Sequence, residues 1–145
     1  MNKFLFASAL ILASTGARAQ PLDAGLRLSA GGDGAARLAL QADGRSGVLR
    51  VSAHFDVDLP VRDSAEAHDK GRWYEGEIRI DGKPCSGARA RLHADQGMAQ
   101  GRASTSCSIG IGADRAVQVE AVVLKAEGVA RDEVRVSLAA EKLPQ

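Results

Sequence analysis

Two cysteines are the residues whose chemistry the sequence defines best. Cys85 and Cys107 form no CxxC or Cys-x-His pattern, so their spacing is not that of a zinc site. In an exported chain, two such cysteines indicate one disulfide. Closing a loop of about twenty residues contributes on the order of 3 kcal/mol to stability. The sequence therefore predicts a Cys85–Cys107 disulfide, with a metal-binding pair as the alternative.

No pattern in the chain predicts catalysis. There is no Gly-x-Ser-x-Gly elbow, and a cysteine in a disulfide cannot act as a thiolate nucleophile. Glu75 and Glu77 could suggest the paired carboxylates of glycoside hydrolysis, but we expect Arg91 and Arg89 to lie opposite them and keep them ionised. No glycine-rich loop leads into a helix. We expect no catalytic residue, no cofactor and no enzymatic activity.

Candidate metal ligands occur in two places. His54, Asp56 and Asp58 share one face of a strand, where successive side chains are about 7 Å apart and cannot converge on one ion. The polar segment 60–70 offers four more candidates, Asp63, Glu66, His68 and Asp69. We interpret both groups as solvated surface and predict no metal site. A small-ligand or metal-binding periplasmic carrier that uses His54, His68 and His93 is the alternative.

The amino-terminal residues have the pattern of a secretion signal. Lys3 precedes an apolar run over residues 4–13, which is too short to span a bilayer, and Ala-Arg-Ala at 17–19 is a small-x-small cleavage site. We expect residues 1–19 to be a cleaved signal peptide and residues 20–145 to form a single domain, periplasmic or secreted. No later apolar stretch is long enough for a membrane span.

Charge and composition narrow the class of partner. Without the leader residues Lys3 and Arg18, the formal net charge changes from +1 to −1, so nucleic acid is not an expected partner. Beyond the leader the chain has no asparagine and much Ala, Gly and Arg, a composition typical of a GC-rich bacterial genome. We expect the partner to be another protein of the cell envelope.

Hydrophobic periodicity predicts an all-β fold. Apolar and polar residues alternate with period two, and turn residues recur about every ten positions. This favours an antiparallel two-sheet β-sandwich of about eight strands, with a small β-barrel as the alternative. The predicted core positions are Leu49, Val51, Ala53, Phe55, Val57, Leu59, Val117, Val119, Ala121, Val123, Val134, Val136, Leu138 and Ala140.

Short connections suggest that successive strands form hairpins. We expect Leu40 to lie opposite Leu49, and Val123 opposite Val134, so that each pair buries the same face. A three-residue loop after Asp81 would place Tyr74 opposite Leu92 and Trp73 opposite His93. Direct pairing of the two cysteines would bring Gln100 and Arg102 to the core face. A β-bulge near Gly101 would reconcile the disulfide with the apolar pattern.

Trp73 is the candidate anchor of a protein-binding surface. The alternation places Tyr74 in the core and Trp73 on the charged face, where an exposed tryptophan is typical of an interface. The predicted surface comprises Trp73, Arg72, Glu75, Arg91 and His93. In the alternative, Gly71 or Gly76 shifts the register and Trp73 belongs to the core. The pattern favours an exported, non-enzymatic protein-binding domain, such as an inhibitor, immunity or accessory factor.

Overall fold

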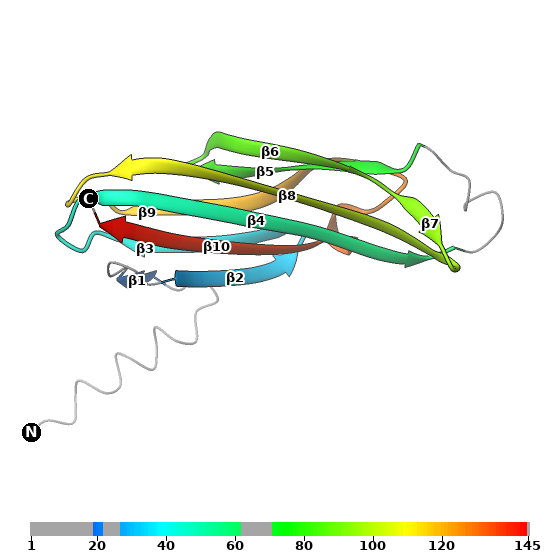
Figure 1. The fold of residues 1–145 in the computed structure, drawn as a ribbon, viewed down its shortest axis with the longest axis horizontal. Coiled ribbons are helices and arrows are strands. Elements are labelled where there is room, and N and C mark those ends of the chain that lie inside the picture. Colours follow the sequence, from blue (N-terminus) through cyan, green and yellow to red (C-terminus); the bar gives the residue numbers. More distant parts are fainter. Residues whose placement is uncertain (1–18, 22–26, 62–70, 145) are drawn as a thin grey trace, which may run out of the picture.

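The computed structural model describes residues 19–21, 27–61 and 71–144, which form strands and one short 3-10 helix (Figure 1). In chain order the elements are β1 Ala19–Pro21, β2 Arg27–Asp33, β3 Ala35–Gln41, β4 Gly47–Pro60, β5 Trp73–Ile80, β6 Lys83–Arg91, β7 His93–Asp95, β8 Met98–Ile111, β9 Val117–Glu127, η1 Arg131–Glu133 and β10 Arg135–Pro144. Residues 1–18 of the expected signal peptide lie outside the described residues, and so do the candidate metal ligands Asp63, Glu66, His68 and Asp69.

The strands form two sheets that pack face to face. Sheet A has the order β1-β3-β9-β5-β6, and sheet B has the order β2-β10-β4-β8-β7. All neighbours are antiparallel except β1 and β3, which are parallel. The sheets are not closed into a barrel, so the predicted β-sandwich is confirmed.

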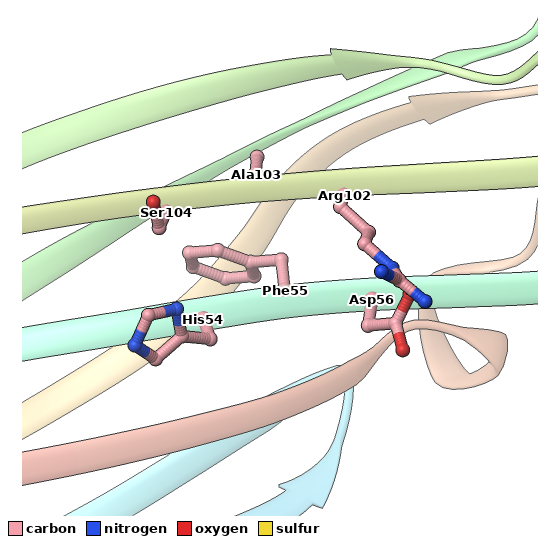
Figure 2. Close-up of a pocket in the computed structure, with 6 residues that line it drawn as sticks. All are labelled: His54, Phe55, Asp56, Arg102, Ala103 and Ser104. Atoms are coloured by element: carbon pink, nitrogen blue, oxygen red, sulfur yellow. The ribbon is translucent and has the colours of Figure 1, made fainter.

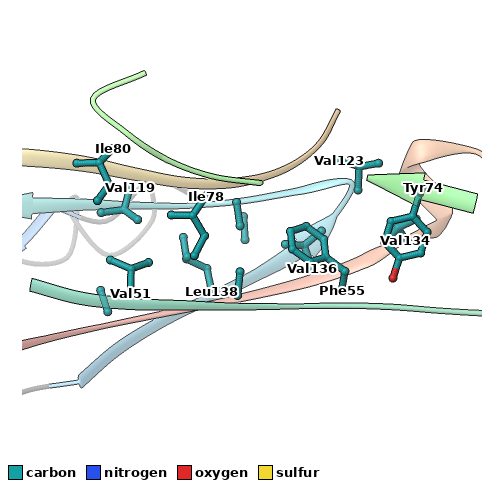
Figure 3. Close-up of a cluster of buried hydrophobic side chains, with 14 of the residues drawn as sticks. Val51, Phe55, Tyr74, Ile78, Ile80, Val119, Val123, Val134, Val136 and Leu138 are labelled. Carbon is teal, nitrogen blue, oxygen red and sulfur yellow. The ribbon is translucent and has the colours of Figure 1, made fainter. Parts of the chain in front are cut away.

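Alternating side chains from both sheets build one core, as Figure 3 shows. Strand β4 alternates buried and more exposed positions from Gly47 to Asp58. Of the core positions predicted on β4, β9 and β10, all are buried except Leu59, which is half-buried at the end of β4. Each fully buried aliphatic side chain contributes about 1.5 to 3 kcal/mol relative to an exposed one. The core therefore supplies most of the stability of the sandwich.

Two of the expected hairpins are arches between the sheets, so those pairings are wrong. Leu40 pairs with Val117 within sheet A, whereas Leu49 pairs with Ile109 in sheet B. Strands β9 and β10 likewise belong to different sheets. The reason is that an arch and a hairpin bury the same apolar faces. Period-two alternation identifies the inward side chains, but it does not identify the sheet that each strand joins.

Two genuine hairpins carry the region around Trp73. Each turns through two residues with positive φ, at 51° and 80° for Asp81 and Gly82, and at 49° and 79° for Gln96 and Gly97. Such pairs are typical of type I′ turns, which match the twist of antiparallel strands. The shorter first loop moves the β5–β6 register by three residues and a one-residue bulge in β6 moves it back by one, so Trp73 lies opposite Arg91. This even net shift keeps Ala88, Arg89, Ala90 and Arg91 on their predicted faces.

The disulfide joins the two sheets. Cys85 and Cys107 are bonded, with their Cα atoms 6.1 Å apart, so the predicted pair is confirmed. The expected bulge near Gly101 is wrong, because the β4–β8 register is continuous through that residue. The bulge lies in β6 instead. Ile78 pairs with Ser86 and Arg79 with Pro84, which leaves Cys85 as the extra residue. From this bulge Cys85 bonds to Cys107 on β8 of sheet B.

Candidate functional site

Trp73 lies on the outer face of sheet A. It is half-buried, whereas the next side chain, Tyr74, is fully buried and donates its hydroxyl to the carbonyl oxygen of Gly101 at 3.1 Å. Burial also raises the pKa of Tyr74 to about 12, with a smaller contribution from the charge of Asp56. The alternative in which Trp73 belongs to the core is therefore wrong.

The indole of Trp73 is held by both neighbouring strands. Its Nε1 donates a hydrogen bond to Oε2 of Glu127 on β9 at 3.0 Å. From β6, the guanidinium carbon of Arg89 lies 4.2 Å from the ring centroid, which is a cation–π contact. These two contacts restrict the rotamers of the indole. Contact with a partner at this position would therefore cost less side-chain conformational entropy.

Charged side chains form transverse rows around the ring. The first row comprises Glu127, Trp73 and Arg91, which are register partners on β9, β5 and β6. The next row comprises Lys125, Glu75 and Arg89. In these two rows the β6 positions are therefore both basic, the β9 positions carry opposite charges, and the β5 positions are Trp73 and the acidic Glu75.

A shallow hollow of about 330 Å³ adjoins this surface. Its lining comprises Glu75, Gly76, Glu77, Gly87, Ala88, Arg89 and Leu124. Leu124 enters it because the β5–β9 register shifts between Glu75 and Gly76, which leaves Leu124 as the extra residue of a bulge. Gly87 contributes no side chain on the opposite strand. We call Trp73, Glu75, Arg89, Arg91, Leu124 and Glu127 the Trp73 patch.

The structure brings together three of the five predicted surface residues, Trp73, Glu75 and Arg91. Arg72 precedes the strand, and its Nε donates to the carbonyl oxygen of Gly128 at 3.1 Å. His93 is exposed on β7 of sheet B, where it pairs with Gln100, so its expected position opposite Trp73 is wrong. The chain changes sheets at Leu92, between β6 and β7, and this removes His93 from the patch.

Arg89, Leu124 and Glu127 are patch residues that the sequence prediction missed. The sequence pattern predicts that Arg89 lies opposite Glu77. In the structure it lies opposite Glu75, with 3.8 Å between Nη1 of Arg89 and Oε1 of Glu75. Glu77 is paired instead with Arg79 on its own strand, at 2.5 Å. Leu124 and Glu127 reach the patch because β9 is the sheet neighbour of β5. No local sequence pattern indicates that the two strands are neighbours.

The outer face of sheet B has a second hollow, of about 370 Å³ (Figure 2). It is lined by His54, Phe55, Asp56, Arg102, Ala103 and Ser104. Asp56 accepts hydrogen bonds from Arg102 at 3.3 Å and from Arg135 at 2.9 Å. His54 lies between Ser104 and Ser137 in the sheet register. The carboxylate in this hollow is therefore engaged by two arginines.

The candidate metal ligands that lie within the described residues do not converge. His54 lies in the middle of β4 and His93 on the edge strand β7, and His68 is outside the described residues. In the described part of the chain, no group of three or more His, Cys, Asp or Glu side chains could hold a metal ion.

One buried charged pair is structural and lies away from both hollows. Lys142 of β10 donates to Oδ1 of Asp43 and to the carbonyl oxygen of Arg45, and both side chains of the ion pair are almost fully buried. The hydrogen bond from Lys142 lowers the pKa of Asp43. This contact ties the last strand to the arch between β3 and β4.

Comparison with known proteins identifies no relative. No known family matches the sequence, and no curated protein is significantly similar to it. Among solved structures, the mosquito-larvicidal Cry4Aa toxin from Bacillus thuringiensis aligns at 7% identity with a TM-score of 0.37. The alignment covers 79% of this chain and 19% of the toxin. So low a TM-score carries no argument about function.

Proposed function

We propose that this protein is an exported, non-enzymatic β-sandwich that binds another protein of the bacterial envelope, as an inhibitor, an immunity factor or an accessory subunit. The observation that carries the proposal is Trp73, an aromatic side chain held at fixed orientation on an outer sheet face by Arg89 and Glu127. Tryptophan and arginine are the residues most enriched at the energetic centres of protein interfaces.

The disulfide supports the exported location. Cys85 and Cys107 are bonded, and such bonds persist in oxidising compartments such as the periplasm. No helix in the described residues is long and apolar enough to cross a membrane.

The engagement of the candidate acidic groups supports binding rather than catalysis. In the hollow beside Trp73, Glu77 contacts Arg79 and Glu75 lies near Arg89. In the hollow on sheet B, Asp56 contacts two arginines. These carboxylates are already engaged by arginines of the same chain, which leaves them less available to a substrate.

The test is capture of a partner by the mature protein and by two matched variants. Trp73→Ala removes the anchor, and His54→Ala truncates an exposed ring on the opposite sheet. With cross-linking in envelope extract, and then with the purified captured protein, we expect Trp73→Ala to weaken binding by about thirtyfold, since anchor residues contribute 2 kcal/mol or more. His54→Ala should bind like the wild type. Equal binding by both variants would contradict the proposal.

Folding must be measured in parallel. Trp73 is half-buried and outside the core, so Trp73→Ala should retain a cooperative thermal transition. Loss of that transition would show that Trp73 serves the fold rather than an interface.

A further inference from the structure

We propose that the Trp73 patch recognises an extended, acidic segment of the partner protein, with an acidic side chain bound at Arg91 and Arg89 and an apolar side chain in the hollow beside Leu124. This inference rests on the proposed function and specifies the chemistry of the partner. It follows from the charges along β6, the shape of the hollow and the spacing between them.

The two arginines have hydrogen-bond donors to offer. Arg91 is exposed and has no carboxylate partner in the part of the chain that the structure describes. The side chain of Arg89 is 51% exposed, and its nearest carboxylate, Glu75, is 3.8 Å away, which exceeds hydrogen-bond distance. Its position over the Trp73 ring restrains the guanidinium group. A guanidinium presented in this way can bind a carboxylate through two parallel hydrogen bonds.

The hollow fits an apolar side chain. Leu124 and Ala88 supply its apolar surface beside the charged side chains of the lining, Gly87 adds no side chain, and the volume of about 330 Å³ exceeds that of one leucine side chain. Burying such a side chain removes both its surface and that of Leu124 from water, at about 25 cal/mol per Å² of apolar area. An apolar residue of the partner is therefore better suited to this position than a charged one.

The spacing points to an extended segment. Gly87, Arg89 and Arg91 alternate along β6 on one face, so neighbouring members are about 7 Å apart. Alternate side chains of an extended peptide repeat at the same interval. The acidic residue and the apolar residue of the partner should therefore be two to four positions apart in its sequence.

The mixture of charges favours a protein segment over a uniform polyanion. Glu75, Glu77 and Glu127 lie among the basic residues and would repel nucleic acid or an acidic polysaccharide. A protein segment can place its acidic side chain on the β6 column alone and keep other residues uncharged. Charge complementarity of this kind determines partner choice and association rate more than affinity.

Two synthetic peptides test the inference directly. One has the sequence Glu-Thr-Leu-Thr-Glu and the other Lys-Thr-Leu-Thr-Lys, both with blocked ends. Trp73 is the only tryptophan in the chain, so its fluorescence reports binding at the patch without a label. We expect the glutamate peptide to bind at least about tenfold more tightly than the lysine peptide, and to weaken as salt screens the exposed charges. Stronger binding of the lysine peptide, or no response to the glutamate peptide, would overturn the inference.

A matched pair of charge reversals locates the contact. Arg91→Glu alters the patch, whereas Arg50→Glu makes the same change on the outer face of sheet B, where Arg50 is exposed. We expect Arg91→Glu to weaken the glutamate peptide by about tenfold and Arg50→Glu by less than about twofold. Equal effects would mean that net charge alone drives binding, and they would overturn the inference.

Measurements with the captured partner distinguish failure of the acidic-segment inference from failure of the proposed protein-binding function. If Trp73→Ala abolishes its binding but Arg91→Glu and added salt leave its affinity unchanged, the acidic segment is wrong and the protein-binding function stands. If Trp73→Ala has no effect, the proposed function itself fails.

Discussion

The outer faces of the two sheets are built from different residues, although the same alternation produces both. On sheet A the face carries Trp73, an apolar bulge residue and rows of mixed charge. On sheet B the outward positions of β4, β8 and β10 carry five serines, Ser52, Ser104, Ser106, Ser108 and Ser137, beside charged residues such as Asp56 and Arg102, and none of these positions is a tryptophan, tyrosine or phenylalanine. Interfaces favour aromatic residues and arginine and are depleted in serine, so the outer face of sheet A has the composition that the proposed binding surface requires.

Irregularities in the sheet, rather than composition alone, create this difference. Strand β5 meets a bulge on each side: Leu124 is the extra residue of β9, and Cys85 is the extra residue of β6. Strands β4 and β8 pair without interruption over their full length. Bulges redirect side chains and are common beside functional sites. The two faces thus share a fold but differ in where the regular ladder is broken.

The largest expected effect is that of the disulfide, which fixes the two faces relative to each other. Replacing both Cys85 and Cys107 by serine, or reducing the bond, should lower stability by about 3 kcal/mol. The melting temperature should fall by several degrees, as measured by thermal unfolding with and without reductant. Below the transition the fluorescence of Trp73 should not change, because its contacts lie within sheet A. Free thiols in the oxidised native protein would contradict this prediction.

Alkaline pH should weaken a second tie between the sheets, the buried hydroxyl of Tyr74 bonded to Gly101. Burial raises the pKa of Tyr74 from 10.0 to about 12 in the folded protein. A raised folded-state pKa gives stability that is complete below pH 10.0 and is lost as the pH rises towards about 12, by roughly 2 to 3 kcal/mol in all.

Spectroscopy can check the ionisation of Tyr74 directly, because it is the only tyrosine in the chain. Tyrosinate absorbance in the folded protein should appear only as the pH approaches 12. The variant Tyr74→Phe should lose this part of the pH dependence of unfolding. A titration midpoint near 10.0 without unfolding would contradict the buried position.

Overpacking beneath the patch should have a smaller effect. A Cβ atom at Gly76 of sheet A would lie 2.5 Å from the ring of Phe55 in sheet B. Gly76→Ala should therefore cost about 2 kcal/mol, measured by denaturant unfolding, since the ring or the backbone must shift. Gly110→Ala is the matched control, because its Cβ would meet open space on the outer side of β8. Equal stability of the two variants would show that Phe55 can move away.

How much of this arrangement can be predicted from sequence differs between the core and the patch. The inward faces of β4, β9 and β10 follow from period-two alternation, because burial alternates in the same way whatever the sheet order. The orientation of Trp73 follows from the same rule. The pairings Leu40–Leu49 and Val123–Val134 fail because inter-sheet arches satisfy the apolar pattern equally well.

The patch depends on long-range neighbours that alternation does not specify. Glu127, which bonds to the indole, is 54 positions from Trp73 in sequence. The β5–β6 turn and the bulge at Cys85 together decide which arginine reaches the ring, because they place Arg91 opposite Trp73 and leave Arg89 diagonal to it. Turn length, bulges and sheet order therefore determine the site, whereas the apolar alternation determines only which side chains face the core.

The smallest effect expected on stability tests how the patch is held. Glu127→Ala removes the acceptor of the indole N–H, a partly exposed hydrogen bond that contributes about 0.5 to 1.5 kcal/mol. Asp58→Ala is the control on sheet B, where that carboxylate accepts a hydrogen bond from Arg135 at 3.1 Å. Both variants should unfold within about 1 kcal/mol of each other.

Only Glu127→Ala should change the fluorescence of Trp73 and weaken partner binding. Without Glu127 the indole can adopt other rotamers, and binding must then restrict it to one, at a cost in conformational entropy. If Asp58→Ala weakens binding equally, the two faces do not differ in function. If Glu127→Ala changes neither the fluorescence of Trp73 nor the affinity for the partner, the contact with Arg89 on β6 is sufficient to hold the indole in place.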